Sequence, residues 1–218
     1  MSTYSELDGK RLAFPPAAAP AYLTLGRFLT RLGNGIDGKP LMSRQTLELI
    51  ALSGAIDVLI ARSTGEDPTW DAVVADDKGK LMVNAGAIEV LRNLAWVDPD
   101  AVTAPVFNVR VMPGREDDSA VEIRSFMGWH ARMTDDQAYL AVTRWWQKPR
   151  EDMTGRPFIA TIAGLCVFVG RISDVGMRLG LAEFEVDTRD KELRDAWLFR
   201  RVQTPPGGNT AILRPRAE

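Results

Sequence analysis

The spacing of apolar side chains along the chain changes near residue 105, from the period of a helix to the period of a strand. In the first part, helical spacing is shown by Tyr22, Leu25, Phe28, Leu29 and Leu32. We therefore predict a helix from about residue 21 to residue 32, ended by Gly33 in a left-handed conformation. A third, short helix is expected over residues 85–94, where Asp98 and Pro99 then stop it.

The second predicted helix begins at Ser43, which can act as its N-cap. It is about 18 residues long and is closed by Ser63, Thr64 and Gly65. Its apolar positions nearly encircle it, so we expect it to be central. The run reads as one continuous helix. This excludes a helix-turn-helix motif, which needs a separate turn.

Beyond Pro105, apolar and polar residues alternate, as they do in strands with one buried face. Two alternating runs, residues 106–111 and 121–125, flank the polar loop 113–119 and predict an antiparallel hairpin. Thr134 and Gln137 form a capping-box pattern, so a helix should run from there to about Trp146. The remaining expected elements are two strands flanking Gly164, a strand over 181–186, a short helix over 189–197 and a turn at 205–209.

These elements predict an α+β fold, with a helical N-terminal half packed on a mixed, mostly antiparallel sheet that carries one or two helices in the C-terminal half. We expect a helical region over residues 1–104 and a strand-rich α/β region over residues 105–218, with one continuous domain as the alternative. Residues 1–18 contain Pro15 and Pro16 and are expected to be irregular.

Composition indicates the cellular compartment that we expect for the protein. The single cysteine, Cys166, excludes an intrachain disulfide and indicates a reducing compartment. The N-terminus has no apolar stretch of a signal peptide, and no run reaches the roughly 18 to 20 apolar residues of a membrane span. We therefore expect a cytoplasmic protein without a membrane partner.

Charge is unevenly distributed along the chain, although 27 basic and 29 acidic residues nearly cancel. Residues 144–218 carry 13 basic and 10 acidic residues, a net charge of +3, and 11 of the 13 are arginines. Arginine favours bidentate contacts to phosphate or carboxylate groups. A solvated surface explains the same excess, so both interpretations stay open.

Several sequence patterns resemble parts of catalytic or cofactor sites, but their neighbouring elements and residues do not match those sites. Residues 33–39 match two glycine-rich phosphate-binding patterns, but these need a preceding strand and a following helix, and here a helix precedes. His130 is the only histidine, which excludes a multi-histidine metal centre, and Cys166 lies in an apolar strand that would suppress its nucleophilicity. Glu183 and Glu185 share one strand face without a third ligand. We predict no catalytic residue, no metal and no cofactor.

The segment after the capped helix combines aromatic and cationic side chains. Stacking on a base together with phosphate contacts would use such residues. The candidate contacts to nucleic acid are Arg144, Trp145, Trp146, Lys148, Arg150 and Arg171. The alternative is structural: one indole fills the core and the cations complement the end of the helix.

The order of features over residues 134–213 resembles an α/β accessory domain of bacterial restriction and HNH-type nuclease proteins. The resemblance is carried by four features. They are the capped helix with Tyr139 that ends in Thr143, Arg144, Trp145 and Trp146; the strand pair from Phe158 to Ile172; a strand with Phe184 at its centre; and a closing turn with Gly207 and Asn209. It covers little over a third of the chain, and residues 1–105 take no part in it. It implies a DNA-associated or defence-associated context.

Three functional hypotheses follow. The first is a non-catalytic nucleic-acid-binding or nucleic-acid-sensing module of a bacterial defence or mobile-element system. It predicts an exposed tryptophan beside a positive groove. The second is a structural or assembly subunit that acts through protein–protein contacts or as a homo-oligomer, and it predicts an exposed apolar patch. The third is an enzyme with an unrecognised site, which would need a deep polar pocket.

Overall fold

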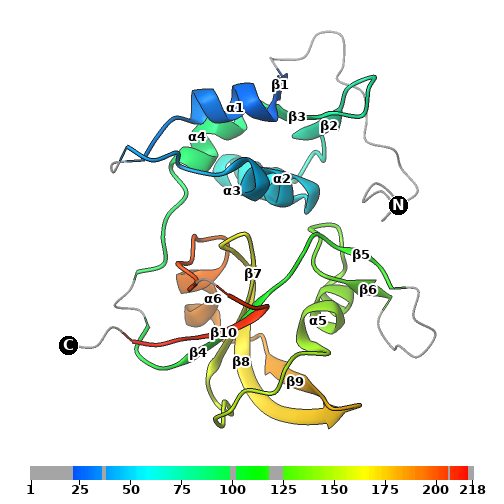
Figure 1. Cartoon of the computed structure of the whole chain (residues 1–218), viewed down its shortest axis with the longest axis vertical. Helices are drawn as coiled ribbons and strands as arrows, with labels where there is room; N and C mark the ends of the chain where they lie inside the picture. The colour runs from blue at the N-terminus through cyan, green and yellow to red at the C-terminus, as the bar shows by residue number, and fades with distance from the viewer. Residues whose placement is uncertain (1–21, 36–37, 99–101, 118–124, 206, 216–218) are drawn as a thin grey trace. The chain divides into compact units, whose positions relative to one another are not determined.

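The computed structural model describes residues 22–35, 38–98, 102–117, 125–205 and 207–215 (Figure 1). Its contacts divide the chain into two compact units. The N-terminal unit comprises residues 1–94 with the short segments 113–115 and 130–132, and the C-terminal unit comprises residues 95–112, 116–129 and 133–218. Each unit has its own sheet and its own helices.

The N-terminal unit combines a small antiparallel sheet with helices (Figure 1). The sheet has the order β1-β3-β2, and its core includes Phe28, Leu47, Ile56, Val83 and Leu91. The elements in chain order are β1 (Tyr22–Thr24), α1 (Leu25–Leu32), α2 (Arg44–Leu52), α3 (Ala55–Thr64), β2 (Val73–Ala75), β3 (Leu81–Asn84) and α4 (Ala87–Arg92). Gly33 ends α1 at the predicted position, but with φ of 84° and ψ of −161° it is not in the predicted left-handed helical conformation.

The continuous helix predicted from Ser43 onward is wrong, because α2 and α3 are separated at Ser53 and Gly54. Gly54 has φ of 70°, a left-handed conformation that breaks the helix, and the Ser53 carbonyl accepts a hydrogen bond from Ala131 N at 2.9 Å. The His130 ring lies against Gly54, so a Cβ there would be 3.1 Å from Cε1. The reason for excluding a helix-turn-helix is therefore removed.

The C-terminal unit is built on a five-stranded sheet with the order β10-β4-β7-β8-β9. All neighbouring pairs are antiparallel except β4 and β7. Its strands are β4 (Val106–Arg110), β7 (Pro157–Ile162), β8 (Leu165–Arg178), β9 (Leu181–Asp187) and β10 (Thr210–Leu213), and its helices are α5 (Asp135–Thr143) and α6 (Lys191–Trp197). A separate two-stranded ribbon pairs β5 (Arg115–Glu116) with β6 (Phe126–Met127).

The two faces of this sheet bury different cores. On one face Phe107, Phe158 and Phe184 form an aromatic cluster, with ring centroids 4.8 to 6.0 Å apart. On the other face, Trp197 of α6 packs in a cluster with Ile159 and Val169. Phe158 and Ile159 are consecutive on β7, so strand alternation directs them to opposite faces.

The hairpin predicted over residues 106–126 is wrong in its pairing. In the described residues β4 lies between β7 and β10, so its partners come from later in the sequence. Val121 and Ile123, which the prediction made the second strand, lie outside the described residues. The capping box at Thr134 and Gln137 is confirmed, although α5 ends at Thr143, three residues earlier than expected.

The α+β class is confirmed, but the predicted distribution of helices and strands is wrong. Within the described ranges, six helices are spread along the whole chain, and three strands lie in the half that was expected to be helical. The short strands β1, β2 and β3 are too brief to show a strand period in the sequence. Their pairing with one another stabilises them.

Candidate functional site

The segment predicted to bind nucleic acid runs along the edge of β9. Arg144 adopts an extended backbone and ends α5. Trp146 and Ala182 then exchange two backbone hydrogen bonds, at 3.1 and 2.7 Å, in an antiparallel bridge. The segment therefore pairs with the outer edge of β9 at Ala182, which explains why an extended chain follows α5 directly.

Two of the predicted contact residues are engaged within the protein. The Arg144 guanidinium forms a salt bridge with Glu183 at 2.9 Å, and their side chains are only 16% and 18% exposed. The Trp146 indole nitrogen donates to the Val142 carbonyl at 2.7 Å. These contacts occupy Arg144 Nη1 and the indole N–H of Trp146, whereas Arg144 Nε and Glu183 Oε1 are buried without a hydrogen-bond partner among the described residues.

Trp145 lies beside the exposed tip of the β8–β9 hairpin. It has φ of 66°, unusual for a bulky residue, and the Arg178 guanidinium lies over its ring at 5.6 Å from the centroid. Three apolar side chains at this tip are exposed: Met177 by 49%, Leu179 by 78% and Leu181 by 36%. We call Trp145, Met177, Arg178, Leu179 and Leu181 the hairpin-tip patch.

The other predicted contact residues lie at different places in the unit. Lys148 is exposed and comes two residues after Trp146, which pairs near the hairpin tip. Arg150 is exposed and precedes Glu151, whose carboxylate binds Arg214, the residue after β10 at the opposite edge of the sheet. The six predicted residues therefore do not form one surface.

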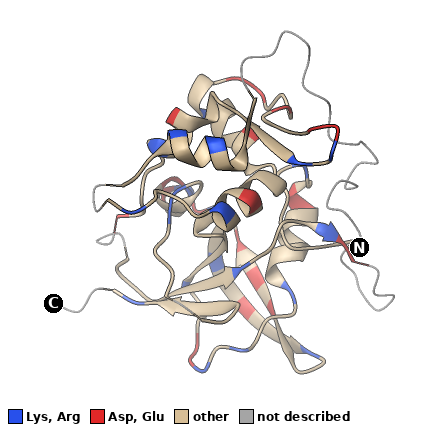
Figure 2. Cartoon of the chain, turned by 45° about the horizontal axis from the view of Figure 1, so that its top comes forward, with Lys and Arg blue, Asp and Glu red and all other residues tan. Residues whose placement is uncertain are grey.

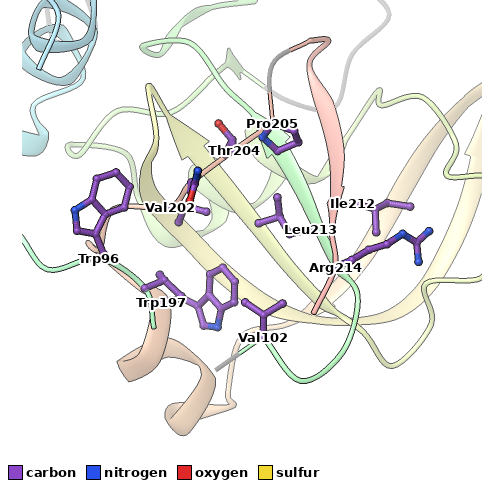
Figure 3. Close-up of a pocket in the computed structure, with 11 residues that line it drawn as sticks. Trp96, Val102, Trp197, Val202, Thr204, Pro205, Ile212, Leu213 and Arg214 are labelled. Atoms are coloured by element: carbon purple, nitrogen blue, oxygen red, sulfur yellow. The ribbon is translucent and has the colours of Figure 1, made fainter. Parts of the chain in front are cut away.

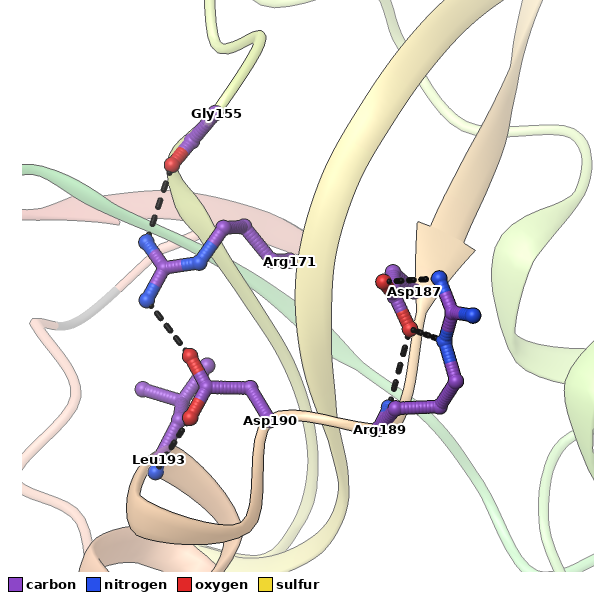
Figure 4. A network of polar contacts seen from close by, with 6 residues as sticks. All are labelled: Gly155, Arg171, Asp187, Arg189, Asp190 and Leu193. Carbon is purple, nitrogen blue, oxygen red and sulfur yellow. Dashed lines mark hydrogen bonds and ion pairs between the residues drawn. The ribbon is translucent and has the colours of Figure 1, made fainter.

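Arg171 is seven residues from Arg178 along β8, or roughly 23 Å at the rise of a strand. Its guanidinium donates to the Gly155 carbonyl at 3.0 Å and to the Asp190 carboxylate at 2.7 Å (Figure 4). Asp190 also accepts from Leu193 N as the N-cap of α6, and these bonds lower the pKa of its carboxyl. Arg171 thus anchors α6 to the sheet.

Basic and acidic side chains are interspersed in the C-terminal unit rather than separated (Figure 2). Arg189 contacts Asp187 through its side chain and lowers the pKa of that carboxyl (Figure 4). Four of the eleven arginines after residue 143, Arg144, Arg171, Arg189 and Arg214, form ion pairs within the unit.

An open groove of about 680 Å³ lies beside β10 and α6 (Figure 3). Its lining is mostly apolar, and we call it the Trp96 groove. It is lined by Trp96, Val97, Val102, Trp197, Val202, Gln203, Thr204, Pro205, Ile212, Leu213 and Arg214. Trp197 is buried, whereas Trp96 is 57% exposed, so the two indoles define an inner and an outer part of the groove.

Backbone pairing holds Trp96 at this position. Arg201 N donates to the Ala95 carbonyl, and Val97 N donates to the Arg201 carbonyl, both at 2.8 Å. The Arg201 guanidinium lies 5.3 Å from the centroid of the Trp96 ring, and partial burial lowers the pKa of Arg201. Arg201 and Trp96 therefore form a cation–aromatic pair at the end of the groove that Trp96 lines.

Arg110 fixes the wall of the groove at Pro205. Its guanidinium donates to the carbonyl groups of Pro205, Gly207 and Gly208. Its backbone N–H donates to the Asn209 carbonyl at 2.7 Å. One arginine thus ties this loop to β4 and places Thr204 and Pro205 along the groove.

Cys166 and His130 are two described residues of types that can take part in catalysis. Cys166 is fully buried and burial raises the pKa of its thiol, so it is a poor nucleophile. His130 belongs to the N-terminal unit, where its Nδ1 accepts from Arg132 N at 3.1 Å. Within the part of the chain that the structure describes, His, Cys, Asp and Glu side chains form no group of three or more suited to a metal ion.

Sequence reasoning did not identify Trp96 or the groove. The lining residues come from three parts of the chain, and only the fold brings them together: Trp96, Val97 and Val102; Trp197 and residues 202–205; and residues 212–214. One available signal was Trp96 itself, a large aromatic residue next to Asp98 and Pro99, beyond the end of a predicted helix. Exposed tryptophans of this kind are enriched in binding sites.

Comparison with protein-family models, with curated proteins and with solved structures finds no match for this chain. Among the described helices, none is both long enough and apolar enough to cross a membrane.

Proposed function

We propose that this protein is a non-catalytic module that acts by binding a partner protein, and that the Trp96 groove holds a segment of that partner. The observation that carries this proposal is an open, mostly apolar groove with a 57% exposed tryptophan beside it. Its volume of about 680 Å³ lies within the usual range of ligand pockets, roughly 300 to 1,000 Å³. Water in such a groove makes few hydrogen bonds, so its displacement by apolar side chains is favourable.

Charge also favours a protein partner. The salt bridges of Arg144, Arg171 and Arg214 use cations that a polyanion would need. The protein as a whole carries a net charge of −2. Affinity would therefore rest on apolar burial more than on release of counterions.

The experiment is a selection of short random peptides displayed on phage, with the full chain as bait. Enriched peptides should bind the wild-type protein, and their affinity should fall at least about tenfold with Trp96→Ala. The reason is that a tryptophan that becomes buried in an interface is frequently a hot spot. Met112→Ala is the matched control, since Met112 is 54% exposed in the same unit but does not line the groove. The proposal fails if no peptide is enriched, or if Trp96→Ala and Met112→Ala have equal effects.

A second candidate is nucleic-acid binding at the hairpin-tip patch. It is supported by the stacking of Arg178 on Trp145, with exposed Lys148 close along the chain, and by the resemblance of residues 134–213 to nuclease accessory domains. Apolar tips can wedge between bases while flanking cations contact phosphates. A role in bacterial defence or on a mobile element would follow. Either candidate would act in the cytoplasm, as the sequence predicts.

Fluorescence anisotropy with labelled single- and double-stranded DNA and RNA tests this second candidate. Two phosphate contacts, from Lys148 and Arg178, predict a log–log salt slope of about −1.8 on duplex DNA, or about tenfold weaker binding between about 50 and 200 mM salt. Lys148→Gln should reduce the slope by about 0.9, whereas Lys191→Gln, an exposed control on α6, should not. Absence of binding at low salt would rule this candidate out.

A further inference from the structure

β10 is an edge strand, and its residues Ile212 and Leu213 line the groove. The sheet ends at β10, and within the described residues no strand pairs with its outer edge. Edge strands of this kind accept an extended peptide as an additional strand, which gives affinity through main-chain hydrogen bonds. Leu213 points from β10 between Trp197 and Val202, whereas Ile212 points to the other side of the strand (Figure 3).

The register identifies the backbone groups that are free to pair. Arg110 N donates to the Asn209 carbonyl, so residues 209, 211 and 213 direct their backbone groups toward β4. By alternation, the N–H and C=O groups of Thr210 and Ile212 point away from β4. Ile212 also lines the groove, so these groups lie next to its apolar surface.

We infer that the groove binds a partner segment in extended conformation, paired with β10 through Ile212, with a large apolar side chain beside Trp197 and an acidic side chain near Arg201. This inference rests on the proposed function and specifies its ligand. The Arg201 guanidinium lies over the ring of Trp96, which lines the groove, and this positive charge favours an acidic side chain at that end of the segment.

A second copy of this chain is a poorer occupant of the groove. A stable dimer buries about 800 Å² on each partner, more than a groove of this size offers. The exposed apolar residues of the hairpin-tip patch have Arg178 among them, which would meet Arg201 as a like charge. A short acidic and apolar segment avoids both difficulties.

The test uses the peptides enriched on the full chain and compares Ile212→Pro with Ile212→Ala. Both variants lose the isoleucine side chain, but only proline removes the outward N–H, and proline is tolerated on an edge strand at such a position. We expect Ile212→Pro to bind roughly five- to tenfold more weakly than Ile212→Ala, the loss of about one backbone hydrogen bond. Arg201→Gln should weaken the peptides that contain acidic residues, and peptide binding should slow amide exchange at Thr210 and Ile212.

The outcomes separate the two proposals. If peptides bind and Trp96→Ala weakens them, but the two Ile212 variants are equal and both amides exchange as before, strand addition is wrong while the proposed function stands. If no peptide binds, the proposed function fails as well. If single-stranded DNA displaces the peptides, the groove is a nucleic-acid site and this inference is overturned. Should Ile212→Pro not fold, the amide exchange of wild-type protein decides.

Discussion

Leu179 sits at the tip of the β8–β9 hairpin in a conformation that suits asparagine or glycine better than leucine. Arg178 and Leu181 are paired, so Leu179 and Gly180 form a two-residue turn, with φ of 51° and 81°. Positive φ at both positions is typical of a type I′ turn, in which asparagine followed by glycine is preferred. A leucine in the left-handed region costs about 1 to 2 kcal/mol. Leu179 is also 78% exposed, so burial does not offset this cost.

We therefore expect Leu179→Asn to stabilise the protein by about 1 kcal/mol, because asparagine tolerates this conformation. The corresponding rise in melting temperature is about 2 to 4 °C, measured by differential scanning calorimetry. The same variant should weaken any ligand that buries the hairpin-tip patch, since a fully buried leucine contributes about 1.5 to 3 kcal/mol. Leu179→Met is the control that keeps an apolar tip and the same backbone strain.

A lower melting temperature for Leu179→Asn would refute the strain argument. It would mean that the leucine side chain stabilises the turn through a contact that the structure does not show. Equal stability with unchanged binding of nucleic acid or partner would refute a functional role of the tip. Stabilisation together with lost binding would indicate that stability is sacrificed for function at this turn.

Three further predictions concern the interior of the protein. Gly170→Ala should destabilise the C-terminal unit by about 1 to 3 kcal/mol in denaturant unfolding. The added Cβ would lie 2.4 Å from Val186 Cγ1 and 2.7 Å from the Asp187 carbonyl oxygen. The control Gly208→Ala should have little effect, because its Cβ would have no atom within 4 Å. Burial raises the pKa of Asp57, so the stability that this group contributes is fully present below its unfolded pKa of about 3.9 and is lost as pH rises through its folded pKa. In unfolding measured across this pH range, the stability of Asp57→Asn relative to wild type should increase as pH rises. A stability difference that does not change with pH would contradict the raised pKa of Asp57. Cys166 should resist a thiol reagent in the folded protein and react after denaturation, because it is fully buried; rapid labelling of the native state would show that the strand opens.

Local signals in the sequence were sufficient where neighbours along the chain decide the structure. The capping box at Thr134 and Gln137 and the alternation of β9 both depend on residues within a few positions of each other. The α+β class followed from the same local periods. These features form with little help from the rest of the fold.

Tertiary contacts decided the features that the sequence did not predict. The run from Ser43 breaks at Gly54, where residues 130–132 contact the turn, and β4 pairs with strands that come about 50 and 100 residues later. Arg144 was a candidate for phosphate contact until the fold placed Glu183 beside it, 39 residues away. The Trp96 groove likewise exists only because the sheet gathers three distant segments. Period and composition identify which side chains can bind a ligand, but long-range pairing decides which of them are already occupied and which remain exposed.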